Sequence, residues 1–294
     1  MLSILIPTYN YKVYPLVREI HKQFDKTGIE FEIRVYDDAS TERFEENKLI
    51  AELPHVIYKV FDENAGRINN RYKLATDARY EYLLFMDDDV FPADRFFASK
   101  LMKELQNKEA DVYFGGLTVP QHSPSHDRIL RWKYGKERES LPLQIRKQSP
   151  YRSIICGSIC LKKDVFLQDT QMMRNLKRYG LDTLFSYTLK QKKRKVKHYQ
   201  NPVVHLGLEK NEDFLHKTRS ALQTIKYLTQ QELLPAGYLR ISQVASRFQG
   251  FLPASLSRFL YKIFSPLLLK NLLSKQASLP VFDFYKLLYY LQLK

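Results

Sequence analysis

Cysteine and long apolar runs are both scarce in this sequence of 294 residues. The two cysteines, Cys156 and Cys160, are too few for a disulfide framework and the wrong number for a cysteine-based zinc site, so we expect a reducing cytosol. No run approaches the roughly 20 apolar residues that a membrane-spanning helix needs, which argues against an integral membrane protein. The first residues also lack the basic region of a secretory signal.

Acidic residues are scarce in the second part of the chain. Residues 1–110 contain 16 basic and 20 acidic side chains, a net charge of −4, whereas residues 111–294 contain 31 basic and 12 acidic, a net charge of +19. No acidic residue occurs between Glu232 and Asp283. This asymmetry predicts an anionic partner for the second part, such as phosphate, nucleic acid or a membrane surface. The alternative is a solvated basic surface.

An alternation of strands and helices is present over the first 110 residues. Short apolar segments at 2–6, 31–36, 55–61 and 82–86 predict strands, and segments with helical spacing follow at 16–24, 74–78 and 93–106. This order predicts an α/β fold with a mostly parallel sheet. In such sheets the C-terminal ends of the strands form the ligand crevice. We therefore expect the polar residues that follow the strands to converge, and these are Asp37, Asp38, Asn64, Gly66 and Asp87 to Asp89.

The second part of the chain is less regular. Residues 111–118 predict a strand, residues 120–150 show no clear period and predict a long loop, and residues 153–161 predict another strand. The tail shows amphipathic helical spacing, with a break expected at Pro266. Residues 240–275 are basic, apolar and free of acidic side chains, which is typical of a helix at a membrane interface. An anionic membrane surface is one interpretation, and packing on the rest of the chain or on a second subunit is the other.

Three consecutive aspartates, Asp87, Asp88 and Asp89, follow the expected strand at 82–86. Their mutual repulsion in a buried place needs a compensating cation. Alternation along an extended segment would put Asp87 and Asp89 on the same side. Mg²⁺ and Mn²⁺ prefer such oxygen ligands, so a metal site is one interpretation and an acidic turn or helix cap is the other.

Taken in order, these segments resemble the inverting family 2 glycosyltransferases, which have the GT-A fold. Residues 3–10 resemble the opening strand and first nucleotide loop of that family, and residues 35–41 its second loop, with Ala39 where glycine is usual. Residues 61–71 resemble its third loop, and residues 85–89 its Asp-x-Asp motif. Residues 180–183 resemble the Glu-Asp motif, with Leu181 in place of the glutamate, and residues 201–205 resemble a segment that often ends in a metal-facing histidine.

The resemblance implies a fold and a set of residue roles. The fold is a GT-A catalytic domain over 1–214, with a nucleotide-binding half at 1–110 and an acceptor half at 111–214, followed by a basic amphipathic helical tail at 215–294. Asp182 would be the general base, and Asp89 with His205 would bind Mn²⁺ or Mg²⁺, although a lone histidine is more often structural. The nucleotide would contact Pro7, Tyr9, Asn10, Asp38, Asn64, Gly66, Arg67, Arg71, Asp87 and Asp88.

The implied activity is a metal-dependent, inverting transfer of a sugar from a nucleotide sugar, expected to be a UDP-sugar, to a hydroxyl of a glycan or lipid-linked glycan. A divalent cation would stabilise the departing diphosphate, and a carboxylate on the opposite face of the sugar would deprotonate the acceptor. Asp89 and Asp182 should then lie across one cleft, although Asp182 at the start of a helix also suits an N-cap. We expect a cytoplasmic protein, peripheral on the inner face of the membrane.

Two other classes of function were weighed against this one. A nucleic-acid-binding protein would suit the charge, but the sequence has no helix-turn-helix, zinc or RNA-binding signature, so no nucleic-acid partner is expected. A sugar nucleotidyltransferase should carry a glycine-rich, arginine-containing loop after the first strand, where this chain has residues 7–10, Pro-Thr-Tyr-Asn.

Overall fold

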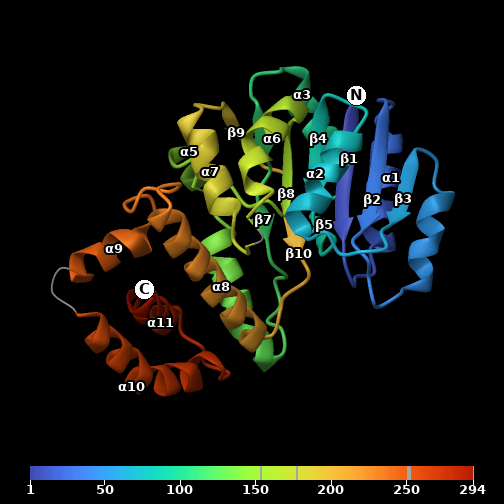
Figure 1. Ribbon diagram of the computed structural model, residues 1–294. Coiled ribbons are helices and arrows are strands. Elements are labelled where there is room, and N and C mark those ends of the chain that lie inside the picture. Colours follow the sequence, from blue (N-terminus) through green and yellow to red (C-terminus); the bar gives the residue numbers. More distant parts are fainter. Residues whose placement is uncertain (153, 177, 250–252, 294) are drawn as a thin grey trace. The chain divides into compact units, whose positions relative to one another are not determined.

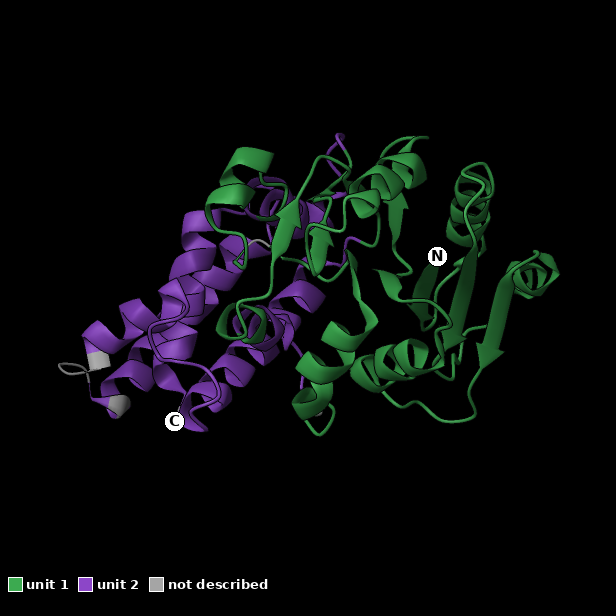
Figure 2. Cartoon of the chain, turned by 90° about the horizontal axis from the view of Figure 1, so that it is seen from above, with its two compact units in different colours: residues 1–120, 139–177, 188–207 green, residues 121–138, 178–187, 208–294 purple. Residues whose placement is uncertain are grey.

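The computed structural model describes residues 1–152, 154–176, 178–249 and 253–293 (Figure 1). Residue 153 of the expected strand and residues 250–252 of the expected interfacial segment lie outside the described residues. The chain forms two compact units, each made of several segments (Figure 2). The first comprises 1–120, 139–177 and 188–207, and the second comprises 121–138, 178–187 and 208–294.

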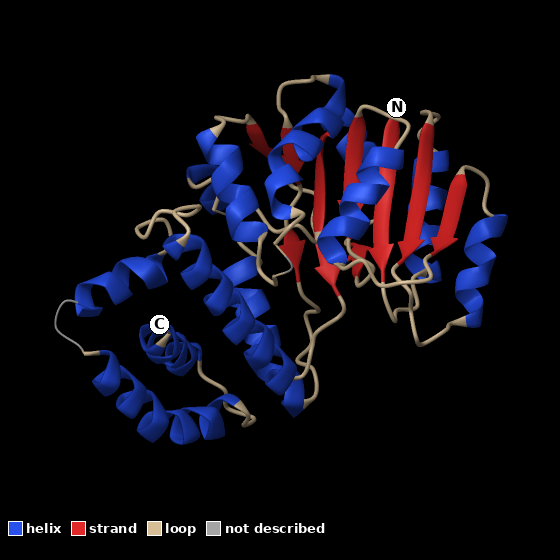
Figure 3. Ribbon diagram, in the orientation of Figure 1, coloured by secondary structure: helices blue, strands red, loops and turns tan. Residues whose placement is uncertain are grey.

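The first unit is built on a seven-stranded sheet with the order β3-β2-β1-β4-β8-β6-β9 (Figure 3). Its strands are β1 (Leu2–Thr8), β2 (Phe31–Asp37), β3 (Val56–Val60), β4 (Tyr82–Met86), β6 (Val112–Phe114), β8 (Ser158–Lys162) and β9 (Val196–His198). Strands β3, β2, β1 and β4 are parallel, and β8 is antiparallel to both of its neighbours. Since β9 is parallel to β6, β8 alone runs against the rest of this sheet, and the expected mostly parallel sheet is confirmed.

Helices cover both faces of this sheet because its central strands are apolar on both faces (Figure 3). Strand β1 is buried along its whole length. Leu84 of β4 belongs to the core that contains the inner faces of α1 (Tyr14–Asp25) and α3 (Phe97–Gln106). Its neighbour Phe85 points to the other face, where its ring lies 4.5 Å from that of Phe166 in α6 (Lys163–Thr170), which packs beside α2 (Arg67–Asp77).

A smaller sheet with the order β5-β10-β7 also belongs to the first unit. It contains β5 (Val90–Pro92), β7 (Leu117–Thr118) and β10 (Val203–His205). Strand β10 is antiparallel to β5, and His205 pairs with Val90. This register places His205 beside the residue that precedes Val90, namely Asp89.

The second unit is helical among its described residues. It contains α4 (Ile129–Tyr134), α8 (Asn211–Gln230), α9 (Arg240–Gln249), α10 (Ala254–Leu272), α11 (Leu279–Gln292) and the beginning of α7 (Asp182–Gln191). Its core joins Leu130 of α4, Leu215 of α8, Leu272 of α10 and Phe282 of α11. The expected C-terminal helical extension is therefore confirmed. Among the described residues, no helix combines the length and apolar character needed to cross a membrane.

The remaining elements are short. They are η1 (Glu45–Glu52), η2 (His126–Arg128), η3 (Gly135–Glu139), α5 (Leu143–Gln148) and η4 (Gln171–Met173).

Three sequence-based expectations about these elements were wrong. Residues 120–150 contain the helices α4 and α5 rather than one long loop, because helices of six residues are too short to show a period and depend on tertiary contacts. Helix α10 continues through Pro266, since its inner face packs on α11 and outweighs the lost backbone hydrogen bond. The expected strand at 111–118 is divided at Gly115 and Gly116 into β6 and β7, which belong to different sheets.

Candidate active site

Three loops meet where β1, β2 and β4 end, at one edge of the large sheet (Figure 3). Thr8, the last residue of β1, pairs with Asp37, the last residue of β2. The backbone N–H of Asp38 then donates to the carbonyl of Thr8 over 2.9 Å. The parallel register therefore brings the polar residues after these strands together, as the sequence predicted.

The carboxylate of Asp38 holds the loop that precedes α2. Its two oxygens accept hydrogen bonds from the backbone N–H groups of Ala65 and Gly66, at 2.8 and 2.9 Å. The side-chain amide of Asn64 donates back to the carbonyl of Asp38 over 2.9 Å. Gly66 has a φ of 83°, in the left-handed region that favours glycine, and it forms the N-cap of α2. Asp38, Asn64 and Gly66 thus form one cluster, and the buried carboxylate faces the start of a helix.

Asn10 joins the first loop to the second. Its side-chain oxygen accepts the backbone N–H groups of Thr41 and Glu42 at 2.8 and 3.0 Å, and its own N–H donates to Ser40 Oγ over 2.8 Å. Pro7 lies within the buried strand β1, whereas the ring of Tyr9 is 47% exposed. Of these first-loop residues, Tyr9 therefore has the side chain most accessible to a ligand, and Asn10 is half-buried.

Asp87 is neutralised by two arginines. Its carboxylate forms ion pairs with Arg67, at 2.6 Å, and with Arg71. Arg71 also donates to the carbonyl of Cys156 over 2.9 Å, and its buried Nε has no hydrogen-bond partner in the described part of the chain. Burial alone would raise the pKa of Asp87, but the two guanidinium groups outweigh it and hold the pKa below its usual value. The compensating charge for this aspartate is therefore supplied by the protein.

Asp88 contacts the end of β1. Its Oδ2 accepts the hydroxyl of Thr8 at 2.8 Å and the backbone N–H of Tyr9 at 3.2 Å. Burial, with a contribution from the charges of Asp89 and Asp87, raises the pKa of Asp88 to about 7, although the two hydrogen bonds oppose this.

Asp89 faces His205. His205 Nε2 lies 3.1 Å from Asp89 Oδ2, and both side chains are partly exposed. The carbonyl of Asp89 accepts the backbone N–H groups of Leu206 and Gly207 at 2.8 and 3.3 Å. A carboxylate oxygen and an imidazole nitrogen at this separation could bind one cation together. Burial and the charges of Asp89 and Asp88 raise the pKa of the nearby Tyr11.

Comparison with known proteins identifies the family. The model of the family described as glycosyl transferase family 2 matches residues 3–169. The chain belongs to glycosyl transferase family 2. It is therefore a glycosyltransferase, and its α/β architecture is that of the GT-A fold. A comparison with curated proteins found no match.

Solved structures of S. aureus TarS share this fold. TarS 1–349 has a TM-score of 0.52 at 17% sequence identity, and the similarity covers 97% of this chain and 89% of that chain. Coverage is the same for TarS 1–349 in complex with UDP-GlcNAc, with a TM-score of 0.51 and 16% identity, and in complex with UDP, with 0.50 and 18%.

Asp182 belongs to the second unit and is described with it. It is the first residue of α7, it is exposed, and its carboxylate has no hydrogen-bond or ion-pair partner among the described residues. The side chain therefore forms no N-cap hydrogen bond, which was the alternative interpretation of this residue. Leu181, where the family usually has glutamate, is buried. The role of Asp182 as a base, and its place across a cleft from Asp89, stay predictions.

Three residues that were not expected from the sequence also shape this site of the glycosyltransferase. Thr8 holds Asp88 and was named only as part of the first-loop segment 3–10, whereas Tyr11, whose pKa the charges of Asp89 and Asp88 raise, lies one residue beyond that segment. Gly207 makes room for Asp89, because a Cβ at this position would lie 2.6 Å from Asp89 Cβ and 2.8 Å from its Cγ, and closer still to Oδ2. The glycine directly after the His205 segment was the available signal.

Proposed function

We propose that this glycosyltransferase uses a UDP-sugar as donor and transfers the sugar to a hydroxyl of a glycan or lipid-linked glycan. The observation that carries this proposal is the convergence of three loops, bearing Asp38, Arg71 and the aspartates from Asp87 to Asp89, at the C-terminal edge of the sheet. The UDP and UDP-GlcNAc bound by the structurally similar TarS 1–349 support a uridine donor. In the proposal, Tyr9 and Asp38 contact the nucleoside, and Arg67 and Arg71 lie toward the diphosphate.

Asp89 and His205 are the residues that would hold Mn²⁺ or Mg²⁺. An oxygen donor and a nitrogen donor 3.1 Å apart fit a borderline divalent cation. No cluster of three or more such groups occurs among residues 1–152, 154–176, 178–249 and 253–293, so the protein would leave coordination positions for phosphate oxygens. When bound, the cation would supply positive charge that stabilises the departing nucleoside diphosphate.

Asp182 is proposed as the general base. Its exposed carboxylate without a partner can accept the proton of the acceptor hydroxyl while that oxygen bonds to the anomeric carbon and the diphosphate leaves. A single displacement of this kind inverts the anomeric configuration. Arg67 and Arg71 keep Asp87 ionised and thereby balance the local negative charge before the donor enters.

Peripheral binding to an anionic membrane is the second part of the proposal. Helix α10 packs on α11 through its inner face, yet its outer face exposes Phe259, Ile263 and Leu267 at 58%, 52% and 68%. Lys262 and Lys270 lie on the same helix, and no acidic residue lies between 233 and 282. An exposed apolar stripe with basic neighbours suits an anionic lipid surface, where a lipid-linked acceptor would be found.

The test is release of UDP from a panel of UDP-sugars with Mn²⁺ or Mg²⁺ and a glycan or lipid-linked glycan acceptor. Asp89→Asn and chelation of the metal should each lower turnover by about 10² to 10³. Asp182→Asn should abolish transfer and leave donor binding unchanged. The matched control is Asp25→Asn, at the exposed end of α1, which should behave as wild type. Full activity of Asp89→Asn in chelator would rule out the metal, and a product of retained anomeric configuration would rule out the single displacement.

A further inference from the structure

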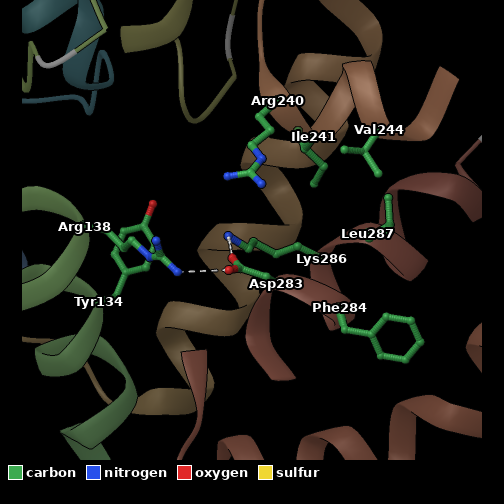
Figure 4. Close-up of a pocket in the computed structure, with 9 residues that line it drawn as sticks. All are labelled: Tyr134, Arg138, Arg240, Ile241, Val244, Asp283, Phe284, Lys286 and Leu287. Atoms are coloured by element: carbon green, nitrogen blue, oxygen red, sulfur yellow. Dashed lines mark hydrogen bonds and ion pairs between the residues drawn. The ribbon is translucent and has the colours of Figure 1, made fainter. Parts of the chain in front are cut away.

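A cavity of about 570 Å³ lies within the second unit (Figure 4). Three segments line this cavity. The first is the end of α4 together with η3, the second is α9 and the third is α11. The lining residues are Tyr134, Arg138, Arg240, Ile241, Val244, Asp283, Phe284, Lys286 and Leu287.

The lining has an excess of positive charge. Arg138, Arg240 and Lys286 are set against a single carboxylate, that of Asp283. One oxygen of Asp283 accepts from Arg138 at 3.2 Å and the other from Lys286 at 2.8 Å, so this carboxylate is shared by two cations. Arg240 has no hydrogen-bond or ion-pair partner among the described residues. The excess is therefore two positive charges, and no acidic residue between 233 and 282 offsets it.

Lys286 is held in place by its neighbours, whereas the side chains of Arg138 and Arg240 are exposed. The amine of Lys286 lies 4.6 Å from the ring centre of Phe282 and 5.6 Å from that of Tyr134, and its side chain is only 19% exposed. In Figure 4 the guanidinium group of Arg240 and the amine of Lys286 point toward the same space, with Arg138 across the cavity. The wall beside them is apolar, formed by Ile241, Val244 and Leu287.

We propose that this cavity binds a phosphate group attached to an apolar carbon skeleton. A phosphomonoester carries a charge close to −2 near neutral pH, which matches the excess charge of the lining. Arginine and lysine together offer charge-assisted hydrogen bonds to its oxygens, and the apolar wall suits the carbon chain that bears it. The lining shares no residue with the proposed donor site, and the proposal does not depend on the identity of the donor sugar.

The test is isothermal titration of the full chain with dihexanoyl phosphatidic acid below its micelle concentration, and separately with inorganic phosphate. Wild-type protein should bind the ester saturably at a site whose affinity falls tenfold or more in Arg240→Gln. The matched control is Arg247→Gln, an exposed arginine of the same helix that does not line the cavity, and it should bind as wild type. Asp283→Asn should bind the ester more tightly, because the lining loses its only negative charge.

The difference expected between Arg240→Gln and Arg247→Gln separates a binding site from general charge attraction, because both variants lose one positive charge and only Arg240 lines the cavity. Equal losses in Arg240→Gln and Arg247→Gln would overturn the proposal, as would the absence of saturable binding to wild type. Weaker binding in Asp283→Asn, with an unchanged circular dichroism spectrum, would also overturn it. Inorganic phosphate binding as tightly as the ester would assign the site to free phosphate, and preference for the ester would assign it to a lipid phosphate. Because no donor or acceptor is present, failure here is distinct from failure of the proposed glycosyl transfer.

Discussion

Replacing Gly207 by alanine should displace Asp89 without an intrinsic backbone penalty. Gly207 does not have a left-handed backbone, so alanine can adopt its conformation. The added Cβ would lie 2.6 Å from Asp89 Cβ, whereas carbon atoms pack at about 3.5–4.0 Å. One of the two segments must therefore move by roughly 1 Å. Such a shift would break the 3.1 Å contact between Asp89 and His205 and strain the hydrogen bonds from Leu206 and Gly207.

The expected result of this change is a loss of about 10² in turnover, since a misplacement of about 1 Å at a catalytic group has effects of that size. The apparent Kd for the metal should rise, and unfolding by urea should show a loss of about 1–3 kcal/mol. Gly237→Ala is the matched control, because that exposed glycine also lacks a left-handed backbone and a Cβ there meets nothing within 4 Å. Wild-type turnover and metal affinity in Gly207→Ala would refute the inferred contact between this residue and Asp89.

Two further predictions concern stability and membrane binding. Burial would raise the pKa of Glu32, but three hydrogen-bond donors and the guanidinium charge of Arg34 outweigh it and lower this pKa in the folded protein. The ionised Glu32 therefore stabilises the folded protein above its unfolded-state pKa of 4.5, and this stabilisation is lost as the pH falls through the folded-state pKa. Glu32→Gln should therefore lower the free energy of unfolding in urea by about 1–3 kcal/mol at pH 7 and by progressively less at acid pH. The control Glu30→Gln, at an exposed position, should leave this free energy unchanged. A loss of stability in Glu32→Gln that did not depend on pH would contradict this prediction. Joint replacement of Phe259 and Leu267 by serine should lower flotation with phosphatidylglycerol vesicles by tenfold or more. The control Ile57→Ser, which also replaces an exposed apolar residue, should float as wild type. Equal flotation of wild type, the double variant and Ile57→Ser would show that α10 does not contact the membrane.

The parts of the site that could be predicted from the sequence are those set by local pattern and strand order. Apolar segments ending in polar residues predicted β1, β2, β3 and β4. The parallel topology then predicted that the loops containing Asp38 and Asp87, which follow β2 and β4, would lie close together. Each of these inferences uses information from one stretch of chain and one rule of sheet geometry.

The parts that could not be predicted depend on contacts between distant segments. The family resemblance implied that His205 and Asp89 would share a metal, but no local pattern shows their proximity. It follows from the antiparallel pairing of β10 with β5, two three-residue strands that lie more than 110 positions apart. Helix α4 has only six residues and takes its place because Leu130 packs among residues of α8, α10 and α11. Neither pairing nor packing leaves a periodic signal in the short segment concerned.

The three consecutive aspartates have different partners in the structure, and this changes which of them is proposed to bind a metal. From the sequence, repulsion among Asp87, Asp88 and Asp89 pointed to an external cation, with an acidic turn or helix cap as the alternative. The structure divides the charge differently, since Asp87 is held by Arg67 and Arg71 and Asp88 by hydrogen bonds at the end of β1. These residues form a turn, with the N–H of Val90 donating to the carbonyl of Asp87, so simple alternation along a strand does not decide where their side chains point.

Only Asp89 is therefore left with a partner that is itself a metal-ligand type. His205 lies 3.1 Å from it, and Gly207 leaves the space that its carboxylate occupies. An imidazole nitrogen and a carboxylate oxygen are both ligand types for a divalent cation such as Mn²⁺. The proposed site for Mn²⁺ or Mg²⁺ is consequently this pair, at the junction of β5 and β10, and not the three aspartates of the motif together.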